Sequence, residues 1–309
     1  MNWERKFAIG ISLSLEPYEY NELFKRYGKY IKEIYFAPVI YDERFTLHTE
    51  ILEQYKDEEF MSDRTKQICD LAKEHGIMLN IVINSSTDGD SDIVMRAREW
   101  WRKWGIIPHK ITVTDNLAVA AFMYGPLSCD LVSSFNNNLE YEDNKFNIDI
   151  NIYEDIVLGG RNIRNVELIK ELHRSNFNVE LIVNNGCSFN CLYCSTRKSE
   201  FCEDIVDENI KKNGLLYHMA QQSVYPSEIE NHYKHLHVDT YKISSRQFGN
   251  YIDFKRVLDL YINGKDPYNK EEFMLTCTLD RMQYHVNKHK FTDEDWEEIK
   301  RIKSTLWKW

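Results

Sequence analysis

Val179–Cys194 reads VELIVNNGCSFNCLYC. Its first five residues are apolar or β-branched apart from one glutamate, which is the composition of a short buried strand. Two asparagines and Gly186 then end the strand, and the glycine lets the backbone turn sharply there. Three cysteines follow at once. A buried strand that ends in a polar loop is a repeating unit of α/β folds, and such loops commonly carry the chemistry.

The same strand pattern recurs along the chain and alternates with amphipathic helical patterns. The expected strands are 7–13, 33–37, 78–84, 110–114, 130–135, 155–158, 179–183 and 240–244. Helices are expected between them, among others at 18–31, 62–75, 93–104, 166–174 and 254–263. Eight such units predict an α/β fold of the (β/α)8 TIM-barrel type. An open doubly wound sheet is the alternative, and the missing G-x-G-x-x-G pattern argues against it.

Two segments exceed what a simple barrel needs. The connection after strand seven is long, so residues 1–265 are predicted to form the barrel with a cysteine-bearing insertion at about 184–237 that partly covers its mouth. Residues 266–309 are predicted to be a C-terminal helical extension packed on the barrel. Within this extension, Thr292 is a plausible N-cap for the acidic helix that follows.

Composition narrows the class of protein. The chain has 309 residues, 43% hydrophobic content and a formal net charge of -10. An acidic surface repels phosphate backbones, so non-specific nucleic-acid binding is not expected, although a local basic patch for RNA is compatible with this charge. No apolar run is long enough for a membrane span or resembles a signal peptide, so a cytoplasmic protein is expected.

Cysteine usage points to a metal site. Four of the seven cysteines fall within 16 positions, and Cys187, Cys191 and Cys194 form a C-x3-C-x2-C motif. Thiolates this close in sequence can surround one iron–sulfur cluster, so a [4Fe–4S] cluster is predicted. Cys202 is the first candidate for a fourth ligand, and Cys277 is a more distant one. A zinc site and plain core packing are the alternatives.

The motif alone resembles radical S-adenosylmethionine enzymes, including the aromatic Tyr193 before the last cysteine. That resemblance implies three cysteines on a [4Fe–4S] cluster and S-adenosylmethionine on the fourth iron. In that family the motif follows the first barrel strand. Here it follows strand seven, which departs from the family pattern.

The order of motifs along the whole chain resembles the collagenase-like U32 peptidase family, over roughly Ile31 to Lys265. The resemblance is carried by DN at 115–116, SSFN at 133–136, IVLGGR at 156–161, ELIVNNGC at 180–187, VYPSE at 224–228 and YKISSR at 241–246. It implies a [4Fe–4S] cluster on four cysteines and oxygen-independent hydroxylation of quinone precursors or RNA bases. Cys187 and Cys194 keep the family's spacing of the first two ligands, and Cys191 between them is a departure.

Candidate catalytic residues lie where strands end, because barrel active sites collect at the carboxyl-terminal face. Asp115 could orient a substrate hydroxyl or act as a base, or it could simply cap the following helix. Arg246 could clamp a carboxylate or phosphate, or form a surface ion pair. Lys242 points into the barrel or out toward a helix depending on register, and an inward lysine would be functional.

Three further strand-end residues, Asn184, Asn136 and Arg161, are predicted to bind the cofactor. Hydrolytic motifs are missing, since the chain has neither H-E-x-x-H nor G-x-S-x-G. The resulting expectation is a cytoplasmic iron–sulfur enzyme that hydroxylates, or otherwise modifies by a redox reaction, a small molecule or an RNA base without oxygen. A radical S-adenosylmethionine enzyme and a non-catalytic metal-binding scaffold or redox sensor are the alternatives, and a partner subunit that completes the site is left open.

Overall fold

The structure is a computed structural model. The structure describes residues 4–40, 57–84, 91–124, 129–134, 137, 139–143, 145–184, 200–245, 248–277 and 280–307.

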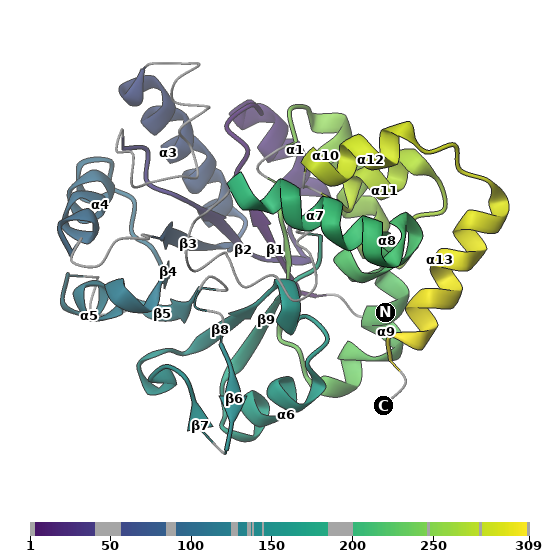
Figure 1. The fold of residues 1–309 in the computed structure, drawn as a ribbon. Helices are drawn as coiled ribbons and strands as arrows, with labels where there is room; N and C mark the ends of the chain where they lie inside the picture. Colours follow the sequence, from purple (N-terminus) through teal and green to yellow (C-terminus); the bar gives the residue numbers. More distant parts are fainter. Residues whose placement is uncertain are drawn as a thin grey trace.

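Eight parallel strands form a closed barrel (Figure 1). Around the barrel, each strand pairs with the next in the order β1, β2, β3, β4, β5, β8, β9 and β10, and β10 pairs with β1 at Tyr241 and Phe7. The strands are β1 (Phe7–Gly10), β2 (Ile31–Phe36), β3 (Met78–Ile83), β4 (Lys110–Val113), β5 (Asp130–Ser133), β8 (Asp155–Leu158), β9 (Asn178–Ile182) and β10 (Thr240–Ile243). This arrangement confirms the predicted (β/α)8 barrel.

Helices surround the barrel, and Figure 1 shows several of them. These helices are α1 (Pro17–Tyr27), α3 (Glu58–Glu74), α4 (Ser91–Lys103), α5 (Asp115–Tyr124), α6 (Val166–Arg174) and α10 (Tyr251–Ile262). A short hairpin of β6 (Tyr141–Glu142) and β7 (Lys145–Phe146) and the 3-10 turns η2 (Ile150–Ile152) and η3 (Gly160–Asn162) flank β8.

Two groups of helices extend the barrel. Between β9 and β10 lie α7 (Glu200–Asn213), α8 (Leu215–Gln222), α9 (Pro226–Asn231) and the turn η5 (Tyr233–Leu236). After α10 come α11 (Lys270–Leu275), α12 (Asp280–Lys288) and α13 (Asp293–Thr305). The two groups share a hydrophobic cluster that includes Met219 of α8, Phe273 of α11 and Met282 of α12. The predicted division at residue 265 stays a prediction.

Element boundaries differ from expectation at the first helix. The pattern predicted a helix over 18–31, but α1 ends at Tyr27 and β2 already begins at Ile31. The reason is the sheet, since Arg5 N donates to Lys29 O at 3.0 Å and Phe7 N donates to Tyr30 O at 3.0 Å. Pairing with β1 therefore takes these residues out of the helix. β1 itself is shorter than the predicted 7–13.

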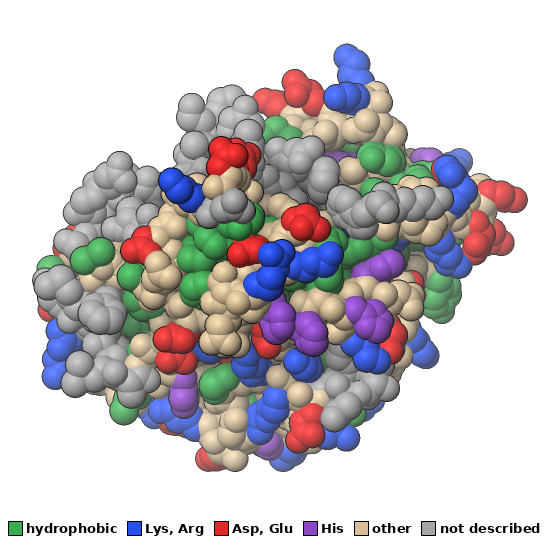
Figure 2. Space-filling model, turned by 90° about the horizontal axis from the view of Figure 1, so that it is seen from below, with side chains coloured by type: hydrophobic (Ala, Val, Ile, Leu, Met, Phe, Trp, Pro, Cys, Tyr) green, Lys and Arg blue, Asp and Glu red, His purple; other side chains and the backbone are tan. Residues whose placement is uncertain are grey.

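Within the described residues, no helix is both long and apolar enough to cross a membrane. Acidic, basic and histidine side chains are interspersed on the face seen from below (Figure 2).

Candidate functional site in the barrel

The barrel interior contains five charged side chains, Glu33, Lys110, Asp155, Glu180 and Lys242, here called the interior charge network. Each is at most 5% exposed. They come from five strands, β2, β4, β8, β9 and β10. Lys110 of β4 contacts carboxylates from strands that are not its neighbours in the sheet, so these contacts cross the interior of the barrel.

Lys110 is the centre of the network. Its Nζ lies 3.0 Å from Glu33 Oε2 and 3.2 Å from Glu180 Oε1, and it is also ion-paired with Asp155. Burial alone would lower the pKa of Lys110, but the three carboxylates outweigh burial and raise that pKa above its ordinary value. Lys110 is therefore a permanently charged structural cation.

Lys242 points into the barrel. Its Nζ lies 3.6 Å from Glu180 Oε2 and 4.3 Å from the centroid of the Tyr35 ring. The Tyr35 hydroxyl donates to Ile243 O at 2.8 Å, which fixes the ring beside the lysine. Lys242 thus contacts one carboxylate, whereas Lys110 contacts three. The N–O distance of the Lys242 ion pair is longer than that of any Lys110 ion pair, so the Lys242 pair is weaker than each of them.

The two glutamates that flank Lys110 differ in their acidity. Burial and then the charge of Glu180 raise the pKa of Glu33. Burial also acts on Glu180, but Lys110 and Lys242 outweigh it and lower the pKa of that carboxyl group. Asn80 Nδ2 donates to Glu33 Oε1 at 2.8 Å, and Thr112 Oγ1 donates to Asn80 Oδ1 at 2.9 Å. Within the network, Glu33 is therefore the carboxyl group that takes up a proton more readily than Glu180.

The cysteine-bearing insertion leaves and rejoins the barrel at one place. After β9, Asn184 Nδ2 donates to Ser244 O at 2.9 Å, and Ser244 N donates to Asn184 Oδ1 at 2.6 Å. Val183 O accepts from Val224 N at 2.8 Å and from the Tyr261 hydroxyl at 3.2 Å. The start of the insertion is therefore fixed to the carboxyl-terminal end of β10, and Val224 within the insertion is fixed to Val183 and to Tyr261 of α10.

Asn84 supplies an unmet acceptor at the end of β3. The residue is 8% exposed, and its Oδ1 has no hydrogen-bond partner among the residues that the structure describes. Buried side-chain oxygens without a partner are uncommon in folded proteins, so this atom is suited to a ligand hydrogen bond.

The structure describes some of the sequence-predicted site residues and not others. Lys242 and Asn184 are placed as given above. The residues outside the described part of the chain are Cys187, Cys191, Cys194, Asn136 and Arg246. The backbone of Asp115 begins α5, that of Arg161 lies in η3 and that of Cys202 lies in α7, but their side chains are not described. The described residues contain no group of three or more His, Cys, Asp or Glu arranged to hold a metal.

Cys277, the more distant ligand candidate, is buried in the hydrophobic cluster shared by the insertion and the C-terminal helices. Its Sγ donates to Gln222 Oε1 at 3.5 Å, and Gln222 Nε2 lies 2.8 Å from His218 Nε2. In this structure the thiol is packed between helices.

Sequence reasoning missed Glu33, Lys110, Asp155 and Glu180 as members of a site. The available signal was a charged residue inside an otherwise apolar strand, repeated on several strands. A single buried charge is costly, so several of them on strands that meet in a barrel predict mutual pairing.

No protein-family model matches the chain, and no curated protein matches it. Solved structures resemble it in fold. The structure of CpGH84B aligns with 97% of this chain at 10% identity and a TM-score of 0.45, and the chain spans 51% of the length of that protein. The U32 peptidase Mk0906 aligns over 78% of this chain and 92% of its own, at 10% identity and a TM-score of 0.46. PbGH5A, a glycoside hydrolase family 5 enzyme from Prevotella bryantii B14, aligns over 92% and 96% at 9% identity and a TM-score of 0.38.

Proposed function

We propose that this protein is an iron–sulfur enzyme whose active site is the carboxyl-terminal mouth of the barrel. The observation that carries the proposal is the position of the cysteine motif. β9 ends at Ile182, Asn184 is fixed to β10, and Cys187 follows in the sequence. Active sites of (β/α)8 enzymes collect at this face, and three thiols at this spacing suit one [4Fe–4S] cluster.

The proposed ligands are Cys187, Cys191 and Cys194, with Cys202 as the fourth. Asn184, Asn136 and Arg161 are proposed to line the cofactor site. For Asn184 the support is its position, because both polar atoms of its side chain already bind the backbone of Ser244. It is thus expected to set the direction in which the cysteine segment leaves the barrel.

The proposed reaction class is oxygen-independent hydroxylation, or a related redox modification, of a small molecule or RNA base. In such a hydroxylation a C–H bond becomes C–OH, water or another donor supplies the oxygen, and an acceptor takes up the two electrons and the protons released. A bound cluster supplies one-electron transfer. Lys242, Asp115 and Arg246 are proposed to orient the substrate, and Glu180 of the interior charge network lies 3.6 Å from the Lys242 ammonium group.

The test is iron and acid-labile sulfide analysis of anaerobically purified protein, with electronic spectra before and after dithionite. We expect about four iron and four sulfide per chain and a visible absorption band that bleaches on reduction. Alanine at Cys187, Cys191 or Cys194 should remove most of the iron. Cys129→Ala is the matched control, because Cys129 directly precedes β5 at the opposite end of the barrel from the mouth.

The same preparation separates the alternatives. One zinc per chain without sulfide would overturn the enzyme proposal and favour a structural metal site. The cysteine spacing also favours the radical-enzyme alternative. If the cluster is present, addition of S-adenosylmethionine and dithionite tests that alternative. Release of 5′-deoxyadenosine would establish that alternative in place of the hydroxylase.

A further inference from the structure

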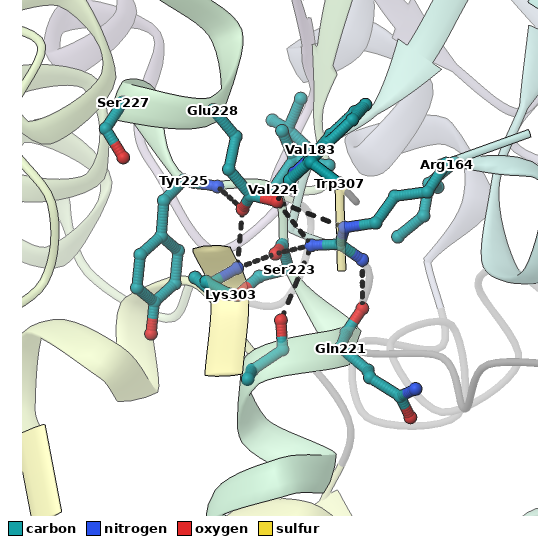
Figure 3. Close-up of polar contacts among 12 residues, drawn as sticks. Arg164, Val183, Gln221, Ser223, Val224, Tyr225, Ser227, Glu228, Lys303 and Trp307 are labelled. Atoms are coloured by element: carbon teal, nitrogen blue, oxygen red, sulfur yellow. Dashed lines mark hydrogen bonds and ion pairs between the residues drawn. The ribbon is translucent and has the colours of Figure 1, made fainter. Parts of the chain in front are cut away.

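Glu228 of α9 accepts hydrogen bonds from three separate parts of the chain (Figure 3). Arg164 donates to Oε1 from Nε at 3.0 Å and from Nη2 at 2.8 Å. Trp307 Nε1 donates to the same oxygen at 2.9 Å. Lys303 Nζ donates to Oε2 at 2.5 Å, and Tyr225 N donates to it at 2.8 Å. Both oxygens of this buried carboxylate therefore accept more than one hydrogen bond.

The two cations also hold the end of α8. Arg164 Nη1 donates to Gln221 O at 2.6 Å, and its Nη2 donates to Ser223 O at 2.9 Å. Lys303 Nζ donates to the same Ser223 carbonyl at 2.6 Å (Figure 3). Carbonyls at the end of a helix need partners, and here charged side chains from α13 and from the connection before α6 supply them.

Aromatic side chains make further contacts around Glu228. The indole of Trp307 stacks on His232, with centroids 4.2 Å apart and an interplanar angle of 5°. It also meets Tyr233 edge-on at 4.8 Å. Lys303 Nζ lies 3.8 Å from the centroid of the Tyr225 ring. Each of these contacts joins the end of α13 to the segment that leads from α8 to β10.

We propose that α13 is a strap that holds the α8–α9 segment, the part of the insertion that returns to the barrel, in place through Glu228. Three parts of the chain meet at Glu228, namely the connection before α6, the start of α9 and the end of α13. Arg164 and Lys303 connect them to the end of α8. The strap contains no ligand of the proposed cluster, so this inference does not depend on the proposed function. Its consequence is that loosening α13 frees the α8–α9 segment while the barrel strands stay ordered.

The test is hydrogen–deuterium exchange measured by mass spectrometry on the full chain, comparing Lys303→Met with wild type. Methionine keeps the apolar stem but leaves Glu228 Oε2 and Ser223 O without the ammonium donor. We expect exchange to become about ten- to a hundredfold faster in peptides that cover 215–231, the range that follows from losing hydrogen bonds to a charged group. Peptides from β1 to β5 should be unchanged. Lys300→Met is the matched control, because Lys300 lies on the same helix and pairs with exposed Glu297.

A second, more conservative variant tests the same proposal if Lys303→Met does not fold. Trp307→Phe retains an aromatic ring but removes the indole donor to Glu228. Faster exchange at 215–231 in either variant, with a stable barrel, supports the strap. Exchange that rises only within α13, or equally in the barrel strands, overturns it, as does unchanged exchange in both variants.

Discussion

Lys110 is held by carboxylates from three other strands, and its replacement measures what the interior charge network contributes to stability. Lys110→Met would leave Glu33, Asp155 and Glu180 buried without their shared cation. Removing one partner of a buried ion pair costs about 3–5 kcal/mol, so we expect the free energy of unfolding to fall by about that amount at pH 7. Urea unfolding followed by circular dichroism measures the change.

The control for this substitution is Lys170→Met, since Lys170 forms an exposed ion pair with Glu167 on α6. That variant should change the free energy of unfolding by no more than about 0.5 kcal/mol. A loss below about 1 kcal/mol for Lys110→Met would mean that the carboxylates find other partners or take up protons at little cost.

The pKa of Glu228 predicts how the stability of the protein changes in acid. Burial would raise the pKa of Glu228, but Arg164 and Lys303 outweigh burial and lower it from 4.5 to about 2. A depressed folded-state pKa stabilises the protein above the unfolded value, and that stability is lost as pH falls from about 4.5 toward 2. We expect the melting temperature of wild type to fall more steeply between pH 5 and pH 3 than that of Glu228→Gln.

Glu228→Gln should already be less stable than wild type at pH 7, because Arg164 and Lys303 then lack their carboxylate. The informative quantity is therefore the slope with pH. Glu167→Gln, at a side chain that is 79% exposed, should keep the wild-type slope. Equal slopes for wild type and Glu228→Gln would show that other carboxylates dominate acid unfolding.

At the scale of single elements, α13 begins with the N-cap that the sequence indicated. Thr292 Oγ1 accepts from Asp295 N at 3.3 Å, and Asp295 Oδ2 accepts from Thr292 N at 2.9 Å. Thr292→Ala should lower the free energy of unfolding by about 1 kcal/mol, the usual cost of losing such a cap. Thr305→Ala at the other end of the helix is the comparison, and an equal loss there would contradict the capping explanation.

Elements were predictable where periodicity was strong. The pattern placed α6 at 166–174 and a strand at 155–158, and both agree with the structure. It failed where tertiary pairing decides the outcome, as at Lys29 and Tyr30, which β1 draws out of the helix. The hairpin of β6 and β7 has two residues per strand, which is too short for any periodic signal.

At the scale of the whole molecule, counting strands was enough to predict the barrel, whereas the interior charge network was not predicted. Each member of the network lies on a different strand, and no two are neighbours in sequence. Only closure of the sheet brings Lys110 to the carboxylates of β2, β8 and β9. For Lys242, the register of β10 decides between the interior and the outside, and the sequence left both open.

The pairing of β1 with β10 affects how a newly made chain folds. Gly10 N donates to Ser245 Oγ at 2.8 Å, and that hydroxyl donates back to Gly10 O at 2.8 Å, although the two residues are 235 apart in sequence. On the ribosome β1 emerges before the other barrel strands, and one of its edges has no partner until β10 has been synthesised. Exposed strand edges recruit other chains, and such distant contacts form slowly. We therefore expect productive folding in the cell to depend on chaperones that shield this edge until β10 has been synthesised.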